Sequence, residues 1–495
     1  MKYQNPIIPG FHPDPSVCRV GKDFYLVTSS FGYFPGIPIF HSQDLVHWEQ
    51  IGHVLTRKSQ LDLSKAGVSG GIYAPTIRYN DGLFWVIVTN VSSGGNFMVH
   101  TEDPRGKWSD PIWIDQGGID PSLFFDDDGS AFYTGTHFTD DGLQGIGMFQ
   151  IDIRTGEKLS DVKMIWHGNG GRCPEGPHLY KIGGVYYLMI AEGGTEYGHC
   201  ETIARSNSVW GPYESCPHNP ILSQNRLMKE NCEIQGVGHA DLIEDGLGNW
   251  WMVFLGHRLS ELYFHHLGRE TFLAPVTWVN GWPVVNAGEP ILGEMDGPLP
   301  PEKRFPQTPR RCDFAEPLGP EWNWLRNPDD ECYVRDGEGI LLSDSGTTLS
   351  GESAPTFLGR RQEHFDMRCM TRLEPEQGET GLTVFYDAEH HYDLLLQNGE
   401  IQLRKRVGDI AFTAYRAPWN GPCVLSVRAD RKRYAFYYGD SAENQISAGT
   451  GLTALVSTEA TPISFTGVYI GIFAQKHGKA RFNWFEYEDL GNAGY

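Results

Sequence analysis

The stretch DPSVCRVGKDFYLV at residues 14–27 contains the pattern that decides the fold. An alternating segment, DPSVCRV, runs into a Gly-Lys turn, and a second apolar segment, DFYLV, follows at once. Apolar segments on both sides of a short turn are typical of a β-hairpin. The arrangement returns along the chain, and its copies begin with DPSVCRV at Asp14, APTIRY at Ala74, DPSLFF at Asp120, EGPHLY at Glu175 and HADLIE at His239.

The spacing of these hairpins predicts a β-propeller. Their second strands begin at Phe24, Leu83, Ala131, Val185 and Trp250, at intervals of 59, 48, 54 and 65 residues. This loose period is about the length of one four-stranded sheet, and five such sheets around an axis form a propeller. The first segment of each copy is then the axis-lining strand, so the five residues that begin the copies should converge at one end of the central channel.

The repeating hairpin pattern of the sequence ends near residue 300. The stretch PLPPEKRFPQTPRR at 298–311 is rich in Pro and Arg, and strand-like segments such as TGLTVFYD at 380–387 return after it without the earlier period. Such segments, separated by turns, suggest a β-sandwich. We therefore predict an all-β chain, with a five-bladed propeller at 1–300, a linker at 301–311 and a concanavalin-like β-sandwich at 312–495.

The composition of the chain limits the kinds of molecule that it is expected to bind and the compartment in which it is expected to work. The net charge of -22 disfavours nucleic acid and anionic membranes. The sequence has no apolar run of membrane-spanning length, and its opening MKYQNPIIPG lacks the apolar core of a signal peptide, so we expect a cytoplasmic protein. The nine cysteines include no CxxC pair, which favours reduced thiols over disulfides or a zinc site.

The converging residues include three acids, which suggests hydrolysis of a glycosidic bond. That reaction needs one protonated carboxyl to donate to the leaving oxygen and one ionised carboxylate to activate water or attack. Glu175 lies between two prolines and should be buried, which favours the acid role, and Asp14 is then the base. Asp120 could raise the pKa of the neighbouring acid through its charge.

Other interpretations exist for several of these residues. An Asp before Pro often caps a turn, and this alone would explain Asp14 and Asp120. Asp126, Asp127 and Asp128 resemble a metal loop, although an exposed turn is the simpler interpretation. His239 could be a structural channel histidine or a ligand of a central cation.

Four segments together resemble glycoside hydrolase family 43, in its β-xylosidase-like branch. They are NPIIPGFHPDPS at 5–16, GIDPSLFFDDDG at 118–129, CPEGPHLYKIGGVYYLMIAEGGTEYGH at 173–199 and LGRETFLAP at 267–275. The resemblance implies a propeller followed by a concanavalin-like sandwich, inversion at the anomeric carbon, Asp14 as general base, Asp120 as the residue that tunes the acid's pKa, and Glu175 as general acid.

The resemblance also implies a set of substrate-binding residues. Arg269 in LGRET would bind sugar hydroxyls, the alternative being a surface ion pair with Glu270. Phe31 would line the pocket and Phe465 would close its rim from the sandwich. Thr195 and His239 are further candidates, and Tyr73 stands where many relatives have Trp, which affects the sugar preference.

We therefore expect an exo-acting, inverting β-xylosidase that releases xylose from the non-reducing ends of short β-1,4-xylo-oligosaccharides, with α-L-arabinofuranosides as a second substrate. The alternatives are a dedicated α-L-arabinofuranosidase and a non-catalytic carbohydrate-binding propeller. The chemistry needs no organic cofactor. Water and calcium both remain open near His239, and the family resemblance suggests a homo-oligomer.

Overall fold

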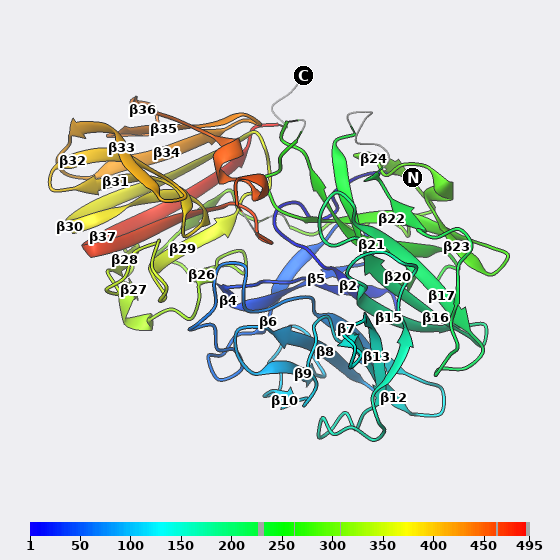
Figure 1. The fold of residues 1–495 in the computed structure, drawn as a ribbon. Helices are drawn as coiled ribbons and strands as arrows, with labels where there is room; N and C mark the ends of the chain where they lie inside the picture. The colour runs from blue at the N-terminus through cyan, green and yellow to red at the C-terminus, as the bar shows by residue number, and fades with distance from the viewer. Residues whose placement is uncertain (226–231, 262, 307, 462–463, 492–495) are drawn as a thin grey trace.

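A computed structural model describes residues 1–225, 232–261, 263–306, 308–461 and 464–491 of the chain. The described part is built from β-strands, and its only helical elements are short 3-10 turns at Asn286–Gly288, Asp330–Cys332, Thr453–Val456 and Thr458–Ala460. Figure 1 shows a propeller and, beside it, a sandwich of long strands. The predicted all-β class and five-bladed propeller are confirmed.

Each blade is an antiparallel sheet whose strands follow one another in the chain. The first blade contains β2 (Ser16–Val20), β3 (Asp23–Val27), β5 (Gly36–Ser42) and β6 (Glu49–Leu55). The second contains β7 (Thr76–Asn80), β8 (Leu83–Asn90), β9 (Gly95–Thr101) and β10 (Ile112–Trp113). The third contains β11 (Ser122–Phe125), β12 (Ala131–Phe138), β13 (Gln144–Gln150) and β14 (Lys163–Trp166).

The last two blades follow the same plan. The fourth contains β15 (Glu175–Ile182), β16 (Val185–Glu192), β17 (Cys200–Ser206) and β18 (Glu214–Ser215), and β19 (Leu222–Ser223) also pairs with β17. The fifth contains β20 (Ile234–Glu244), β21 (Trp250–Arg258), β22 (Glu270–Val279) and β23 (Trp282–Val285). The hairpins read from the sequence are thus the first two strands of each blade.

The N-terminal segment joins the first blade to the last. Its strand β1 (Lys2–Gln4) pairs with β24 (Glu294–Asp296), which follows the fifth blade. The Tyr3 hydroxyl and the Asn5 side-chain amide both donate to the carbonyl of Leu273 in β22. Because these contacts are buried and span more than 260 residues of sequence, they hold the ring of blades closed.

A buried ion pair ties the blades together at the axis. Arg78 of the second blade donates to Asp241 of the fifth at 2.7 Å, and we call these two residues the channel pair. Asp241 also accepts hydrogen bonds from Ser16 of the first blade and Tyr180 of the fourth. His178 of the fourth blade lies 2.9 Å from Arg78. The inner strands therefore meet around one fully buried carboxylate.

The C-terminal sheet begins with β25 (Arg311–Asp313). Its other strands are β27 (Tyr333–Arg335), β28 (Ile340–Ser343), β29 (Thr356–Arg361), β30 (Met367–Asp387), β31 (His390–Gln397), β32 (Glu400–Val407), β33 (Ile410–Pro418), β34 (Cys423–Ala429), β35 (Arg433–Gly439), β36 (Gln445–Leu452) and β37 (Tyr469–Asp489). The first half of β30 pairs with β34 and its second half with β31, while β37 pairs with β30 throughout. Register shifts around residues 372–379 separate the halves, so the same two strands serve both layers of the sandwich.

The sandwich packs against the rim of the propeller. The short strands β4 (Tyr33–Phe34) and β26 (Trp324–Leu325) pair across the two parts. The rings of Tyr33 and Tyr469 stack with centroids 3.9 Å apart, and Arg361 donates to the carbonyl of Phe11 at 2.7 Å. Residues of the sandwich are thereby fixed beside the channel mouth.

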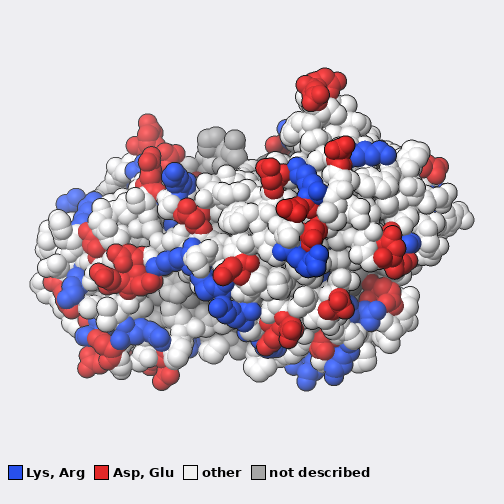
Figure 2. Space-filling model, turned by 90° about the horizontal axis from the view of Figure 1, so that it is seen from below, with Lys and Arg blue, Asp and Glu red and all other residues white. Residues whose placement is uncertain are grey.

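Figure 2 shows one face of the molecule, on which acidic and basic side chains are interspersed. All nine cysteines have free thiols. Among the described residues, no helix has the length and apolar character needed to cross a membrane. The expected homo-oligomer and cytoplasmic location stay predictions.

Candidate active site

Three of the residues that begin the repeated sequence segments have an unusual backbone, although His239 lies within β20 and Asp14 and Asp120 precede β2 and β11. Asp14, Asp120 and His239 have φ angles of 55°, 55° and 50°. Non-glycine residues seldom adopt this left-handed conformation, and where they do, function is a common reason. The equivalent position in the fourth blade is Glu175, which is followed by a register shift and by Gly176 with φ of 59°. The repeat alignment read from the sequence therefore matches the backbone.

Asp14 is a buried carboxylate with several partners. Ser29 donates a hydrogen bond to one oxygen at 2.5 Å, and Arg269 donates to the other at 3.0 Å. The His239 ring lies 3.8 Å from the same oxygen that Arg269 binds. Burial alone would raise the pKa of Asp14, but Arg269, His239 and Ser29 outweigh it and hold the pKa below its ordinary value. Asp14 is therefore ionised.

Arg269 connects Asp14 to the pocket wall. Its guanidinium also donates to the Thr195 hydroxyl at 2.9 Å and to the carbonyl of Phe465 at 3.2 Å. The alternative pairing with Glu270 does not form, because Glu270 accepts two hydrogen bonds of 2.7 Å from Arg258. Arg269 is thus oriented toward the acids.

Three aromatic rings from distant parts of the chain form the wall. The centroid of Phe31 lies 5.2 Å from Tyr73 and 6.0 Å from Phe465, and the Tyr73 and Phe465 centroids are 5.9 Å apart. The Ser69 hydroxyl accepts a hydrogen bond from the backbone N–H of Phe465 at 3.0 Å. The sandwich therefore places the Phe465 ring against Phe31 and Tyr73.

Asp120 and Glu175 have pKa values shifted in the direction opposite to Asp14. Burial, Glu175 and Asp14 together raise the pKa of Asp120 well above its ordinary value, although the N–H of Gly176 donates to it at 3.2 Å. Burial and the charge of Asp14 raise the pKa of Glu175 to about 7. The site thus contains an ionised carboxylate beside carboxyls that retain their protons near neutral pH.

The family comparison gives this arrangement its context. A family model described as glycosyl hydrolases family 43 matches residues 3–283. The chain belongs to this family. A second model, for the beta xylosidase C-terminal concanavalin A-like domain, matches residues 311–488. This family 43 chain is therefore a glycoside hydrolase, and its second part is the predicted concanavalin-like sandwich.

Individual relatives resemble the family 43 chain over its whole length. It is 41% identical to a non-reducing end alpha-L-arabinofuranosidase of Bacteroides ovatus, over 99% of this chain and 95% of the relative. It is 40% identical to a xylosidase/arabinosidase of Butyrivibrio fibrisolvens, over 98% of both chains. The crystal structure of a xylan beta-1,4-xylosidase from Bacillus halodurans superposes with a TM-score of 0.92 at 33% identity, over 98% of this chain and 100% of that one.

The surroundings of His239 do not fit a calcium ion. Calcium takes six to eight oxygen ligands, whereas Asp14, which lies 3.8 Å from the His239 ring, is already bound by the Arg269 guanidinium. Among the described residues, no group of His, Cys, Asp and Glu side chains could hold a metal. Asp126 instead accepts hydrogen bonds from Lys181 and Tyr186. We derive no step through a metal.

Sequence reasoning missed two features of this family 43 site. Ser29 binds Asp14, but a serine in VTSS gives no signal of such a contact. The channel pair did leave a signal, because Arg78 in APTIRY and Asp241 in HADLIE are opposite charges on axis-lining strands. Charged residues there must be paired if they are buried.

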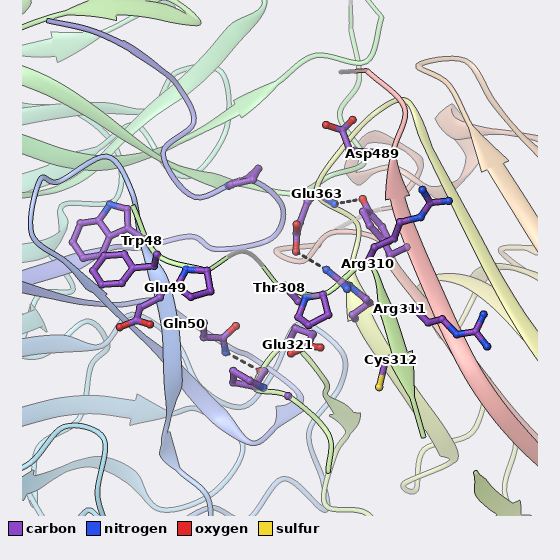
Figure 3. A pocket seen from close by; sticks show the side chains of 18 of the residues that line it. Trp48, Glu49, Gln50, Thr308, Arg310, Arg311, Cys312, Glu321, Glu363 and Asp489 are labelled. Atoms are coloured by element: carbon purple, nitrogen blue, oxygen red, sulfur yellow. Dashed lines mark hydrogen bonds and ion pairs between the residues drawn. The ribbon is translucent and has the colours of Figure 1, made fainter. Parts of the chain in front are cut away.

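A large cleft elsewhere contains none of the predicted site residues. It has a volume of about 1180 Å³ and lies where the propeller, the segment after residue 300 and the sandwich meet. Figure 3 shows Trp48 and Gln50 of the propeller on one side and Arg311 and Glu363 on the other. Gln50 donates to the carbonyl of Pro320 there, which connects the two parts. Asp14, Asp120 and Glu175 do not line this cleft.

Proposed function

We propose that this family 43 hydrolase releases xylose from the non-reducing ends of short β-1,4-xylo-oligosaccharides by a single, inverting displacement. The observation that carries the proposal is the opposed protonation of Asp14 and Glu175 in one buried site. The pKa of Asp14 lies below its ordinary value, and that of Glu175 is raised to about 7. One acid and one base in opposite states are what a glycosidase requires.

In the proposed reaction, Asp14 accepts a proton from a water molecule whose oxygen attacks the anomeric carbon. Glu175 donates its proton to the glycosidic oxygen, and the bond between that oxygen and the anomeric carbon breaks. The products are a sugar of inverted configuration and a shortened alcohol, with Asp14 protonated and Glu175 ionised. This route requires the two carboxyls to stand roughly 6.5–9.5 Å apart, leaving room for water.

Arg269 has two tasks in this proposal. Its bond to Asp14 keeps the base ionised, and its remaining donors bind sugar hydroxyls. Nη2 of Arg269 donates one N–H to the carbonyl of Phe465, and its other N–H has no hydrogen-bond partner among the described residues, so the guanidinium has donor capacity that the protein does not use. A sugar hydroxyl is a suitable acceptor for it.

Exo-cleavage is supported by the aromatic wall. Phe31, Tyr73 and Phe465 pack against one another beside the acids, and Phe465 comes from the sandwich. A pocket walled in this way admits a chain end more readily than the middle of a polymer. Single sugars would then be released.

Arabinofuranoside cleavage is the second candidate. It is supported by the names of the relatives, one an alpha-L-arabinofuranosidase and another a xylosidase/arabinosidase. A β-D-xylopyranoside and an α-L-arabinofuranoside present similar hydroxyls around the scissile bond, so the same acid and base could serve both.

Proton NMR of xylobiose hydrolysis tests the proposal. We expect α-xylose as the first product of the wild type and almost no released xylose with Glu175→Gln. Immediate β-xylose would contradict an inverting mechanism and the role of Asp14. Rates on the nitrophenyl β-D-xyloside and α-L-arabinofuranoside then rank the sugars. If only the arabinoside is cleaved, the second candidate replaces the first.

A further inference from the structure

The sandwich has a groove of its own, apart from the acids. It has a volume of about 420 Å³ and lies over the outer strands β31, β32 and β33. Its lining includes His391, Asp393, Arg404, Arg406 and Lys476. The volume is that of a small-molecule site, and no predicted site residue belongs to it.

Cross-strand pairing places this groove on the sheet face that packs against the propeller. One row of paired residues runs from Tyr469 through Phe385 and His391 to Arg406. Tyr469 and Phe385 belong to the apolar cluster that also contains Phe31 of the pocket wall. Neighbouring strands lie about 4.8 Å apart, so Arg406 is three strands, or about 14 Å, from Tyr469.

The other charged side chains of the groove have hydrogen-bond partners within the protein. Arg404 donates two hydrogen bonds to Glu379, at 2.7 and 2.9 Å, and Lys476 donates to the same carboxylate at 3.0 Å. Asp393 lies 3.0 Å from the His391 ring and accepts from Thr383 at 2.8 Å. These contacts fix the side chains before any ligand arrives.

Arg406 is the exception. Arg406 lines the groove, and among the described residues its guanidinium forms no hydrogen bond or ion pair with another residue. A buried donor without a partner is costly, and a guanidinium is best satisfied by two oxygens of one carboxylate. The groove therefore presents a cation without a paired acid, and Asp393, which lines the same groove, still has carboxylate lone pairs for hydroxyl donors.

We propose that this groove binds a uronic acid unit of an acidic oligosaccharide. The carboxylate of the sugar pairs with Arg406, and its hydroxyls donate to Asp393. A single positive charge next to an acceptor matches a monoanion with several hydroxyls and disfavours a multiply charged phosphate. The choice of a sugar rests on the chain's being a glycoside hydrolase, and it does not depend on which pentose the enzyme releases.

Calorimetry on the full chain carrying Glu175→Gln tests the proposal without hydrolysis. The probes are a xylo-oligosaccharide with one glucuronic acid side group and the neutral oligosaccharide of the same length, each with excess xylobiose to fill the catalytic pocket. We expect the acidic probe to bind at least tenfold more tightly, and the preference to weaken as salt rises. Equal affinity for the two probes would overturn the proposal.

Two arginine variants make the test specific. Arg406→Gln should abolish the preference, whereas Arg433→Gln, an exposed arginine on β35, should keep it. Both should hydrolyse a nitrophenyl pentoside at the wild-type rate, within about twofold. Retained preference in Arg406→Gln, or a parallel loss of pentoside turnover, would contradict a separate uronate site. Failure of the wild type on pentosides would instead count against the proposed function.

Discussion

Buried carboxyl groups lie at two levels of the propeller axis, two residues apart along the inner strands, and their pKa values are not shifted in one common direction. At the mouth are Asp14, Asp120 and Glu175, which we call the mouth carboxyls. Two residues beyond His239 is Asp241 of the channel pair, and its pKa is held well below the usual range by Arg78, against the effect of burial. Asp120 is also buried but has no cation in contact, and its pKa is raised.

The comparison shows that burial alone does not determine the protonation state of an acid. Burial raises the pKa of both Asp120 and Asp241. At Asp241, Arg78 outweighs it together with His178 and Tyr180, whereas at Asp120 the charges of Glu175 and Asp14 add to it. The channel pair is thus built for stability, and the mouth carboxyls for proton transfer. Each prediction below changes one set and asks whether the other responds.

The largest effect should come from Glu175→Gln at the mouth. The amide cannot donate the catalytic proton, so we expect kcat/KM on a nitrophenyl pentoside to fall about 10³-fold or more. Stability in urea should change little, because Glu175 is only half-buried, lies among like charges and forms no ion pair with the described residues. Glu196→Gln, an exposed glutamate paired with Arg172, is the control and should stay fully active. A variant of Glu175 that keeps a tenth of the activity would contradict the assignment.

Arg78→Met, in the channel, should have a larger effect on stability than on activity. It leaves Asp241 buried without its cation, which we expect to lower the free energy of unfolding by about 3–5 kcal/mol. Urea denaturation measures the loss. The double variant with Asp241→Asn should recover part of it, because no unpaired charge then remains. If Arg78→Met is as stable as the wild type, the channel pair does not hold the blades together.

Arg269→Gln tests whether the mouth depends on its own cation. Arg269 lowers the pKa of both Asp14 and Glu175, so its loss should move both limbs of the pH profile of kcat/KM to higher pH. The wild-type basic limb should lie near pH 7, since activity is lost as Glu175 ionises. We also expect a tenfold to roughly 100-fold lower kcat/KM from lost sugar contacts.

Arg172→Gln is the matched control for this experiment. Arg172 lowers the pKa of Glu175, whereas the groups that lower the pKa of Asp14 are Arg269, His239, Ser29 and His199. Its removal should therefore raise only the basic limb. Movement of both limbs in Arg172→Gln, or of neither in Arg269→Gln, would show that these charges do not set the two pKa values.

Removal of metal ions with a chelator should have the smallest effect on activity. The channel already contains the guanidinium of Arg78, and the neighbours of His239 do not suit calcium. We expect kcat/KM to change by less than about twofold after dialysis against EDTA, with added calcium as the control. A loss that calcium restores would mean that a metal acts at the axis despite this arrangement.

Much of the fold could be predicted from the sequence because each blade repeats a local signal. Turn residues and alternating apolar positions specify a hairpin within about 15 residues, as at 14–27, and its repetition implies the ring. The 21-residue strands β30 and β37 were not predicted, since only the segment at 380–387 was read as a strand. β30 changes its partner from β34 to β31 along its length, with register shifts against β37. No local sequence pattern reveals such a change of partner.

The sequence by itself determined which residue types are available at the mouth. Asp14, Asp120, Glu175 and His239 begin equivalent segments of the sequence repeat. Arg269 and Phe465 were found through the family resemblance. Tertiary structure alone decided which cation binds which acid. Arg269 turns to Asp14 instead of its neighbour Glu270, and Arg78 reaches Asp241 across 163 residues of sequence. The physical reason is that a pKa depends on burial and on charges within a few ångströms, and folding brings those charges together from distant parts of the chain.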